Sequence, residues 1–135
     1  MNEIENILLE EEGQYLKLGD IGAYRIAFDL SNYVWDRVVK WNYFEKDTVG
    51  KQYVRAVDSI SANIAEGFGR YGKREKVQFF RYSFGSMKEA FDWNEKAKIR
   101  NLISPEDYQH IFSELQKLPR EINYLIRYTN EKLKF

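Results

Sequence analysis

Apolar residues recur every three or four positions along four long stretches of this 135-residue sequence. The stretches span residues 20–42, 49–67, 73–101 and 104–129. This spacing places the apolar side chains of each stretch on one face of a helix, whereas a half-buried strand would alternate every two residues. Short connections between long helices favour neighbours that run in opposite directions. The sequence therefore predicts an all-α fold, an antiparallel up-down-up-down four-helix bundle.

Residues that cap helix N-termini precede three of these stretches. Asp20 is a suitable N-cap for the first helix, and Asp47 or Thr48 for the second. Ser104-Pro105-Glu106-Asp107 combines an N-cap, a proline at the first helical position and acidic side chains in the first turn, which makes it the clearest helix start in the chain. Pro119 lies inside the fourth stretch, and we expect it to kink or locally open that helix.

The apolar stripe of the first helix predicts which of its residues enter the core. That stripe consists of Ile21, Tyr24, Phe28, Ser31, Trp35 and Val38. The third helix carries apolar residues on two faces, which indicates two neighbouring helices. Gly85 lies in its middle, where glycine costs about 1 kcal/mol relative to alanine. Such a glycine typically allows another helix to approach closely, so we expect the second helix to contact Gly85 through residues 59–63.

Acidic and basic residues are unevenly distributed, although 21 of each cancel in the whole chain. Residues 1–20 contain six acidic residues and one basic residue, which leaves 15 acidic and 20 basic residues in the remainder. We predict an acidic N-terminal leader, residues 1–19, followed by a four-helix bundle domain, residues 20–135. The leader is either a frayed end or an arm that packs on a neighbouring subunit. The mildly basic body permits contact with nucleic acid without requiring it.

Residue types needed for most catalytic and metal sites are scarce. The chain has no cysteine, which excludes disulfides, thiolate nucleophiles and cysteine-bound zinc, and His110 is its only histidine. Gly67, Gly69 and Gly72 match the Gly-x-Gly-x-x-Gly pattern of dinucleotide sites, but they follow a predicted helix where that motif follows a strand. We therefore predict no enzymatic activity and no catalytic, metal-binding or cofactor-binding residues. No run of about 18 apolar residues occurs, which predicts a soluble, cytoplasmic protein with no membrane partner.

The connection between the second and third predicted helices is the best candidate for a binding site. Its basic residues, with one more from the third helix, are Arg70, Lys73, Arg74, Lys76 and Arg81. Such a cluster favours phosphate groups, Tyr71 adds a ring on which a base can stack, and the start of a helix adds a favourable dipole. The alternative is that these side chains are simply solvated. A second basic cluster, residues 96–100, suits the C-terminal end of the third helix.

Small and polar residues interrupt the apolar stripe of the second helix. They belong to the stretch Ser59-Ile60-Ser61-Ala62-Asn63-Ile64-Ala65-Glu66-Gly67-Phe68-Gly69-Arg70. Serine, asparagine and glutamate burden a helix interior unless their side chains have partners. We interpret this stretch as a closely packed polar seam, in which Glu66 is bonded to Asn63, Arg70 or a neighbouring helix.

The same stretch closely resembles the signature of the four helix bundle protein family, also called the 23S rRNA-intervening sequence protein family. Lys73–Glu89, with an aromatic run followed by Gly85-Ser86, is similar to the third helix of that family. The resemblance covers about residues 20–133. It marks a set of positions that are expected to be structural: Ser59, Asn63, Glu66, Gly67, Gly69 and Gly85.

This resemblance implies a bacterial cytoplasmic protein with a left-handed four-helix bundle that assembles into a homopentameric ring. It also implies similarity in fold to the accessory variability proteins of diversity-generating retroelements, which are basic pentamers that bind a reverse transcriptase and nucleic acid. The family has no established catalytic residues. Two functions are therefore compared: binding of RNA, DNA or a ribonucleoprotein through Arg70–Lys76, and an oligomeric scaffold for a protein partner with no direct nucleic-acid contact.

Overall fold

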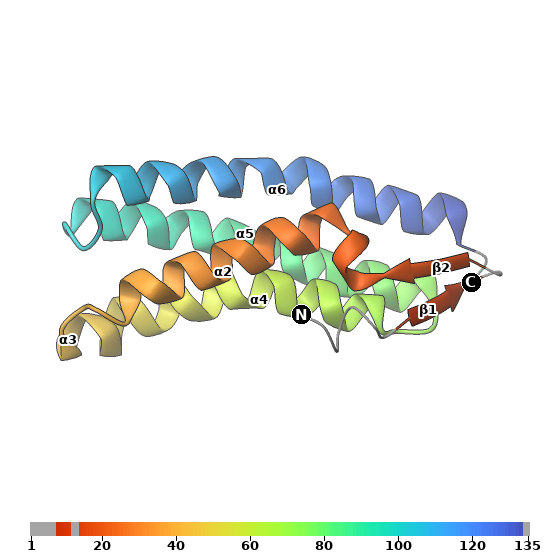
Figure 1. Ribbon diagram of the computed structural model, residues 1–135, viewed down its shortest axis with the longest axis horizontal. Coiled ribbons are helices and arrows are strands. Elements are labelled where there is room, and N and C mark those ends of the chain that lie inside the picture. Colours follow the sequence, from red (N-terminus) through yellow and green to blue (C-terminus); the bar gives the residue numbers. More distant parts are fainter. Residues whose placement is uncertain (1–7, 12–13, 134–135) are drawn as a thin grey trace.

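The computed structural model describes residues 8–11 and 14–133. Four long helices lie side by side along one axis (Figure 1). They are α2 (Gly22–Val38), α4 (Lys51–Phe68), α5 (Lys73–Ile99) and α6 (Pro105–Lys132). α4 packs against α2 and α5, while α6 packs against α5 and α2 (Figure 1). This arrangement confirms the prediction of an all-α body with four helices.

A short β-hairpin precedes the bundle. Its strands are β1 (Leu8–Glu11) and β2 (Gln14–Lys17), and the 3-10 turn η1 (Leu18–Asp20) leads from β2 into α2. Sequence spacing does not predict these strands, because four residues are too few to show a convincing alternation. Asp20 is not the N-cap of α2, which corrects the predicted start. Its carboxylate accepts a hydrogen bond from the backbone N–H of Lys17 (3.2 Å), and Ile21 takes the N-cap position.

The connection from α2 to α4 is itself helical. It contains α3 (Tyr43–Glu45) and the π-helical turn η2 (Lys46–Gly50), which continues directly into α4. Asn42 starts this run, because its side chain accepts a hydrogen bond from the backbone N–H of Glu45 (2.9 Å) and the Glu45 carboxylate accepts one from the N–H of Asn42 (3.4 Å). This reciprocal capping box begins at Asn42, five residues before Asp47. The prediction of an N-cap at Asp47 or Thr48 is therefore wrong.

The core-facing side of α2 differs from the predicted stripe. The buried residues of α2 are Ala23, Tyr24, Ala27, Leu30, Val34 and Val38. Phe28 and Ser31 are half-buried and Trp35 is 54% exposed, so these three residues lie beside the core. Alanines on the core face leave room for close packing of the neighbouring helices, while Phe28 and Trp35 lie at the edge. Tyr24 and Val38 belong to both stripes, so the prediction is right in part, and spacing alone does not distinguish the two faces.

The close approach of α4 and α5 involves Gly67 and not Gly85. No described side chain or neighbouring backbone atom lies within 4 Å of the position that a Cβ would take at Gly85, and Gly85 is exposed. A Cβ at Gly67 would lie 2.7 Å from Cε1 of Phe80. Near the middle of both helices, the buried Ser83 hydroxyl donates a hydrogen bond to the carbonyl of Ile60 (2.8 Å). The predicted seam therefore exists, but the predicted role of Gly85 in it is wrong.

The N-terminus of α6 has the predicted cap. The Ser104 hydroxyl oxygen accepts a hydrogen bond from the backbone N–H of Asp107 (3.0 Å), and Pro105 occupies the first helical position. The helix continues through Pro119 to Lys132, so the proline does not end or open it. This places the C-terminal turn of α6 beside the first turn of α5, where the candidate site lies.

Candidate nucleic-acid interface

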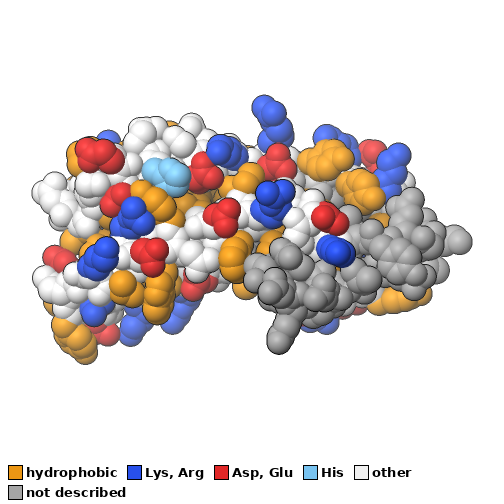
Figure 2. Space-filling view, in the orientation of Figure 1, with side chains coloured by type: hydrophobic (Ala, Val, Ile, Leu, Met, Phe, Trp, Pro, Cys, Tyr) orange, Lys and Arg blue, Asp and Glu red, His pale blue; other side chains and the backbone are white. Residues whose placement is uncertain are grey.

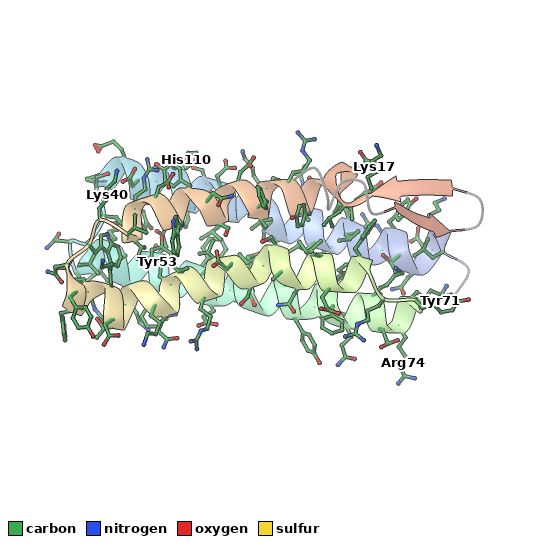
Figure 3. The ribbon with its side chains drawn as sticks, turned by 60° about the horizontal axis from the view of Figure 1, so that its bottom comes forward. Lys17, Lys40, Tyr53, Tyr71, Arg74 and His110 are labelled. Carbon is green, nitrogen blue, oxygen red and sulfur yellow. The ribbon has the colours of Figure 1, made fainter. Side chains whose placement is uncertain are left out.

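The predicted basic cluster lies at the end of the bundle where α4 ends and α5 begins. α4 ends at Phe68 with Gly69 as its C-cap, and Gly72 is the N-cap of α5. Figure 3 shows Tyr71 at this end, with the Arg74 side chain directed away from the bundle. The five predicted binding residues differ in their surroundings. Lys73, Arg74 and Arg81 line one groove, whereas Arg70 and Lys76 do not.

Lys76 is not available for binding at the surface. It is 3% exposed, and its ammonium group donates a hydrogen bond to the carbonyl of Phe68 (2.9 Å). Phe68 is the last residue of α4, so the cation meets the negative end of that helix dipole. The aliphatic part of the lysine is long enough to lie in the core while its charge reaches a backbone carbonyl. Lys76 therefore fixes the end of α4, and its assignment to the binding cluster is wrong.

Arg70 is held by neighbouring side chains. Its guanidinium group forms ion pairs with the carboxylates of Glu66 (3.0 Å) and Glu75 (3.6 Å) and lies 4.7 Å from the ring centroid of Phe79. Its Nε atom is buried and has no hydrogen-bond partner among the described residues. Glu66 is exposed, so the predicted pairing with Arg70 is found but the predicted buried network around Glu66 is not.

Lys73 connects the start of α5 to the end of α6. Its ammonium group donates hydrogen bonds to the carbonyl oxygens of Asn130 (3.2 Å) and Leu133 (3.0 Å). These carbonyls belong to the last turn of α6 and the residue after it, which have no partner within the helix. Lys73 is half-buried, so part of its charge still faces the adjoining groove.

Arg74 and Arg81 are the exposed members of the cluster. Within the described part of the chain, neither arginine forms an ion pair. Together with Lys73 they line a groove of about 670 Å³ on the α5 side of the bundle, which we call the basic groove. Its other lining residues are Val77, Gln78, Tyr82 and Asn130. None of the described side chains that line it is acidic, so the groove is suited to an anion.

Three polar residues of the basic groove were not among the predicted site residues. Gln78 and Tyr82 lie on α5, where the Gln78 amide donates a hydrogen bond to the Tyr82 hydroxyl (2.5 Å). Asn130 comes from α6, so only the folded structure brings it next to Lys73. The sequence could have predicted Gln78 as a site residue, because the helical spacing of positions 74, 78 and 81 places them on one face of α5.

A second polar cluster joins α2 to α6 in the other half of the bundle. The Tyr33 hydroxyl donates a hydrogen bond to the Asp107 carboxylate (2.6 Å), and Arg37 forms an ion pair with the same carboxylate (3.4 Å). The Tyr33 hydrogen bond, supported by Arg37, lowers the pKa of Asp107. Burial and the neighbouring carboxylate raise the pKa of Tyr33. These shifts keep the carboxylate charged and the phenol neutral, which suits a structural link.

His110 lies beside Tyr33 of this cluster. The single histidine lies at the surface, and its ring centroid is 4.2 Å from that of Tyr33 (Figure 2). The described residues contain no group of three His, Asp or Glu side chains that could hold a metal ion. Among residues 8–11 and 14–133, no helix combines the length and the apolar content that a membrane crossing requires.

Comparison with known proteins identifies the family. Residues 19–124 match the family described as 23S rRNA-intervening sequence protein, and they make up more than half of the chain. The chain belongs to this family. The resemblance seen in residues 59–70 is therefore confirmed, whereas the similarity to the accessory variability proteins of retroelements stays a prediction.

A solved structure has a fold similar to that of this chain. It is the crystal structure of a protein of unknown function from the S23 ribosomal protein family of Bacteroides thetaiotaomicron. The two chains superpose with a TM-score of 0.67 at 16% sequence identity, over 77% of this chain and 97% of the other. At this identity the likeness concerns the fold alone. A search of curated proteins found no match.

The residues of this chain that match the family signature have mostly local roles in the structure. The Ser59 hydroxyl donates to the carbonyl of Arg55 (2.7 Å), and the Asn63 amide donates to the carbonyl of Ser59 (2.9 Å). Gly67 allows close packing of α5, with Cβ of Phe79 3.0 Å from the position of an added Cβ. Gly69 caps α4 with an ordinary right-handed backbone, φ −81°.

Proposed function

We propose that this protein is a non-enzymatic, antiparallel four-helix bundle that assembles in the cytoplasm into a homopentameric ring and binds nucleic acid. The observation that supports binding is the basic groove, whose described lining includes Lys73, Arg74 and Arg81 and no acidic side chain. The family resemblance supports the ring and the proposed likeness in fold to accessory variability proteins.

The side chains of the basic groove suit a phosphate backbone with accessible bases. A guanidinium group donates two parallel hydrogen bonds to a phosphate, which makes Arg74 and Arg81 the main contacts. Tyr82 is 49% exposed and offers a ring for stacking, and Gln78 and Asn130 offer amides. The start of α5 lies at this groove and adds the positive end of a helix dipole. Stacking on Tyr82 favours a single strand over a paired duplex.

Assembly would repeat the basic groove around the ring. Each groove contributes only a few phosphate contacts, so a single copy is expected to bind weakly. Several linked grooves on one strand raise the overall affinity without any new type of contact. We therefore expect long single strands to bind more tightly than strands that reach only one groove.

The test is fluorescence-anisotropy binding of single-stranded RNA, structured RNA and duplex DNA to the purified protein. We expect the Arg74→Glu/Arg81→Glu variant to lose roughly 10- to 100-fold in affinity for single-stranded RNA, because two charge-assisted contacts are reversed. The matched control is Lys40→Glu/Arg100→Glu, which changes the net charge equally. Both control residues are exposed, and Figure 3 shows Lys40 and Arg74 at opposite ends of the bundle. Equal losses in both variants, or no binding by the unaltered protein at low salt, would reject the proposal.

The second candidate function is a scaffold for a protein partner. Exposed aromatic side chains in α3 favour it, since Tyr43 is 78% and Phe44 72% exposed. Contacts through such side chains depend little on salt, in contrast to phosphate contacts. Co-purification of one stoichiometric protein that is released by Tyr43→Ser/Phe44→Ser, with no nucleic-acid binding, would favour the scaffold.

A further inference from the structure

An aromatic ring is held in place beside the cations of the basic groove. Tyr82 follows Arg81 on α5, both side chains line the groove, and Tyr82 is 49% exposed. The Gln78 amide donates a hydrogen bond to the Tyr82 hydroxyl (2.5 Å). The Phe79 ring packs against the tyrosine ring with centroids 5.4 Å apart and planes at 86°. An edge-to-face contact engages at most one face of the tyrosine ring, so ring surface stays accessible in the groove.

Phe79 is itself held by the end of α4. Its Cβ lies 3.0 Å from the position that a Cβ would take at Gly67, so a side chain at Gly67 would displace it. The Arg70 guanidinium group lies 4.7 Å from the ring centroid of Phe79. Ion pairs with Glu66 and Glu75 hold that guanidinium group in turn. The stretch of α4 that carries the family signature is therefore connected to the basic groove through Phe79.

A ring that is already held in place is a better stacking surface than a freely rotating one. A free side chain loses rotamer freedom when a ligand binds, and this loss weakens binding, whereas a preorganised side chain has lost that freedom on folding. Nucleobases suit a flat ring next to cations, because their faces stack on aromatic side chains while the attached phosphates bind the cations. Purines have two fused rings and cover more of a tyrosine ring than pyrimidines do. Differences in stacking strength give such a surface a base preference.

We propose that the basic groove prefers purine-rich single strands, because Gln78 is a positioning residue that holds the Tyr82 ring as a stacking surface. This inference rests on the proposed nucleic-acid binding and adds to it a base preference and the residue that sets it. Arg74 and Arg81 lie two helical turns apart, about 10 Å along α5, and bind phosphates on either side of Gln78. A base next to the phosphate at Arg81 stacks on Tyr82.

Three RNA probes of equal length separate stacking from phosphate binding. They are oligoadenylate, oligouridylate and a ribose-phosphate backbone without bases, and fluorescence anisotropy measures their affinities for the full chain. We expect oligoadenylate to bind about fivefold or more tightly than the backbone without bases, and more tightly than oligouridylate. Tyr82→Leu should bring both affinity ratios close to one and leave the salt dependence of backbone binding unchanged. The control Tyr43→Leu changes an exposed tyrosine of α3, at the opposite end of the bundle (Figure 1), and should leave both ratios unchanged.

The positioning role of Gln78 is tested by removing each partner of its hydrogen bond. Gln78→Met and Tyr82→Phe both break this bond and keep a side chain of similar size. We expect each to lower the ratio of oligoadenylate affinity to backbone affinity about twofold or more. The double variant should lose no more than a single one, because both substitutions remove the same interaction. The matched control is Gln109→Met, since Gln109 is an exposed glutamine of α6 whose amide donates to the Ser113 hydroxyl (3.2 Å).

A fluorescent base gives a spectroscopic readout of stacking. One 2-aminopurine replaces a uracil of oligouridylate, and its fluorescence falls when the base stacks on an aromatic ring. Binding to the unaltered protein should quench it, and binding to Gln78→Met should quench it less at equal saturation. Equal quenching in these two proteins would show that Gln78 does not position the ring.

The outcomes distinguish failure of this inference from failure of the proposed function. Equal affinity for all three probes, with binding still lost in Arg74→Glu/Arg81→Glu, would overturn the base preference and leave phosphate binding in place. No binding of any probe at low salt would reject both. Equal effects of Tyr82→Leu and Tyr43→Leu, or losses that multiply in the double variant, would overturn the roles assigned to Tyr82 and Gln78.

Discussion

Gly67 and Gly85 give a matched test of packing at single residues. We expect Gly67→Ala to destabilise the protein by about 1–3 kcal/mol, because its Cβ would overlap Phe80 and the backbone of α5. Gly85→Ala is expected to stabilise it by up to about 1 kcal/mol, since alanine favours the helix and the site is open. Urea unfolding of both variants measures the two changes. If Gly85→Ala destabilised the protein, the result would instead support the close approach of a helix at Gly85 that the sequence predicts.

Asp107 gives a residue-level prediction about pH. Its pKa is lower in the folded protein than in the unfolded chain, so its contribution to stability is present above an ordinary carboxyl pKa of about 4 and is lost as pH falls through the folded value. Tyr33→Phe removes the hydrogen bond that is the main cause. We expect a loss of about 1 kcal/mol at neutral pH that shrinks in acid. Urea unfolding near pH 7 and near pH 2.5 tests this, and an equal loss at both would show that the hydroxyl does not act through the carboxylate.

The binding cluster shows what sequence predicts at the residue scale. Arg74 and Arg81 lie at the surface as expected, because their positions on α5 face away from the core. In the sequence Lys76 resembles these exposed arginines. It is nevertheless buried, because its ammonium group donates a hydrogen bond to the carbonyl of Phe68. That partner is eight residues away across a turn, and spacing within one helix gives no sign of it.

At the scale of helices, the core-facing stripe of α5 contains three polar residues. Lys76, Ser83 and Asn94 are buried on the same face as Phe80, Met87 and Ala90. Each has a partner: Ser83 donates to the carbonyl of Ile60, and Asn94 accepts a hydrogen bond from the Tyr53 hydroxyl (2.6 Å). Apolar spacing predicts this helix and the burial of Phe80, Met87 and Ala90. It does not predict the burial of Lys76 and Asn94, because a polar residue is assigned to the surface until its partner is known.

Ser83→Ala tests the connection between α4 and α5. We expect a loss of about 0.5–1.5 kcal/mol in the free energy of unfolding, because the buried carbonyl of Ile60 loses its side-chain donor. Ser86→Ala is the control, since Ser86 is half-buried one turn away and should change stability by less than about 0.5 kcal/mol. Equal losses of stability in both variants, measured by thermal or urea unfolding, would show that this hydrogen bond does not stabilise the contact between α4 and α5.

At the scale of the whole molecule, four helices and their order follow from sequence, while the surfaces between them do not. The basic groove needs Asn130 beside Lys73, and a second groove, between α2 and α4, needs Trp35 beside Ala62. Both pairs join residues that are far apart in the chain. The spacing of apolar residues predicts each helix separately. Which faces of two helices lie next to each other is decided only when the helices pack.

Assembly of the bundle gives a prediction about mass. A homopentamer of the 16.2 kDa chain has a mass of about 81 kDa, five times that of one chain. Exposed side chains such as Ile99 (75%) and Tyr124 (56%) supply apolar surface for such contacts. Native mass spectrometry at micromolar concentration should show this species. A species of 16.2 kDa alone would contradict the assembly and the multivalent binding that depends on it.

The salt dependence of RNA binding tests the central claim, that Arg74 and Arg81 contact phosphates. Each phosphate contact with a single strand contributes about 0.7 to the slope of log K against log salt concentration. Arg74→Ala/Arg81→Ala should therefore make the slope shallower by about 1.4 for each groove that is engaged, whereas Lys40→Ala/Arg100→Ala should leave it unchanged. An unchanged slope in the first variant would show that the basic groove does not bind the phosphate backbone.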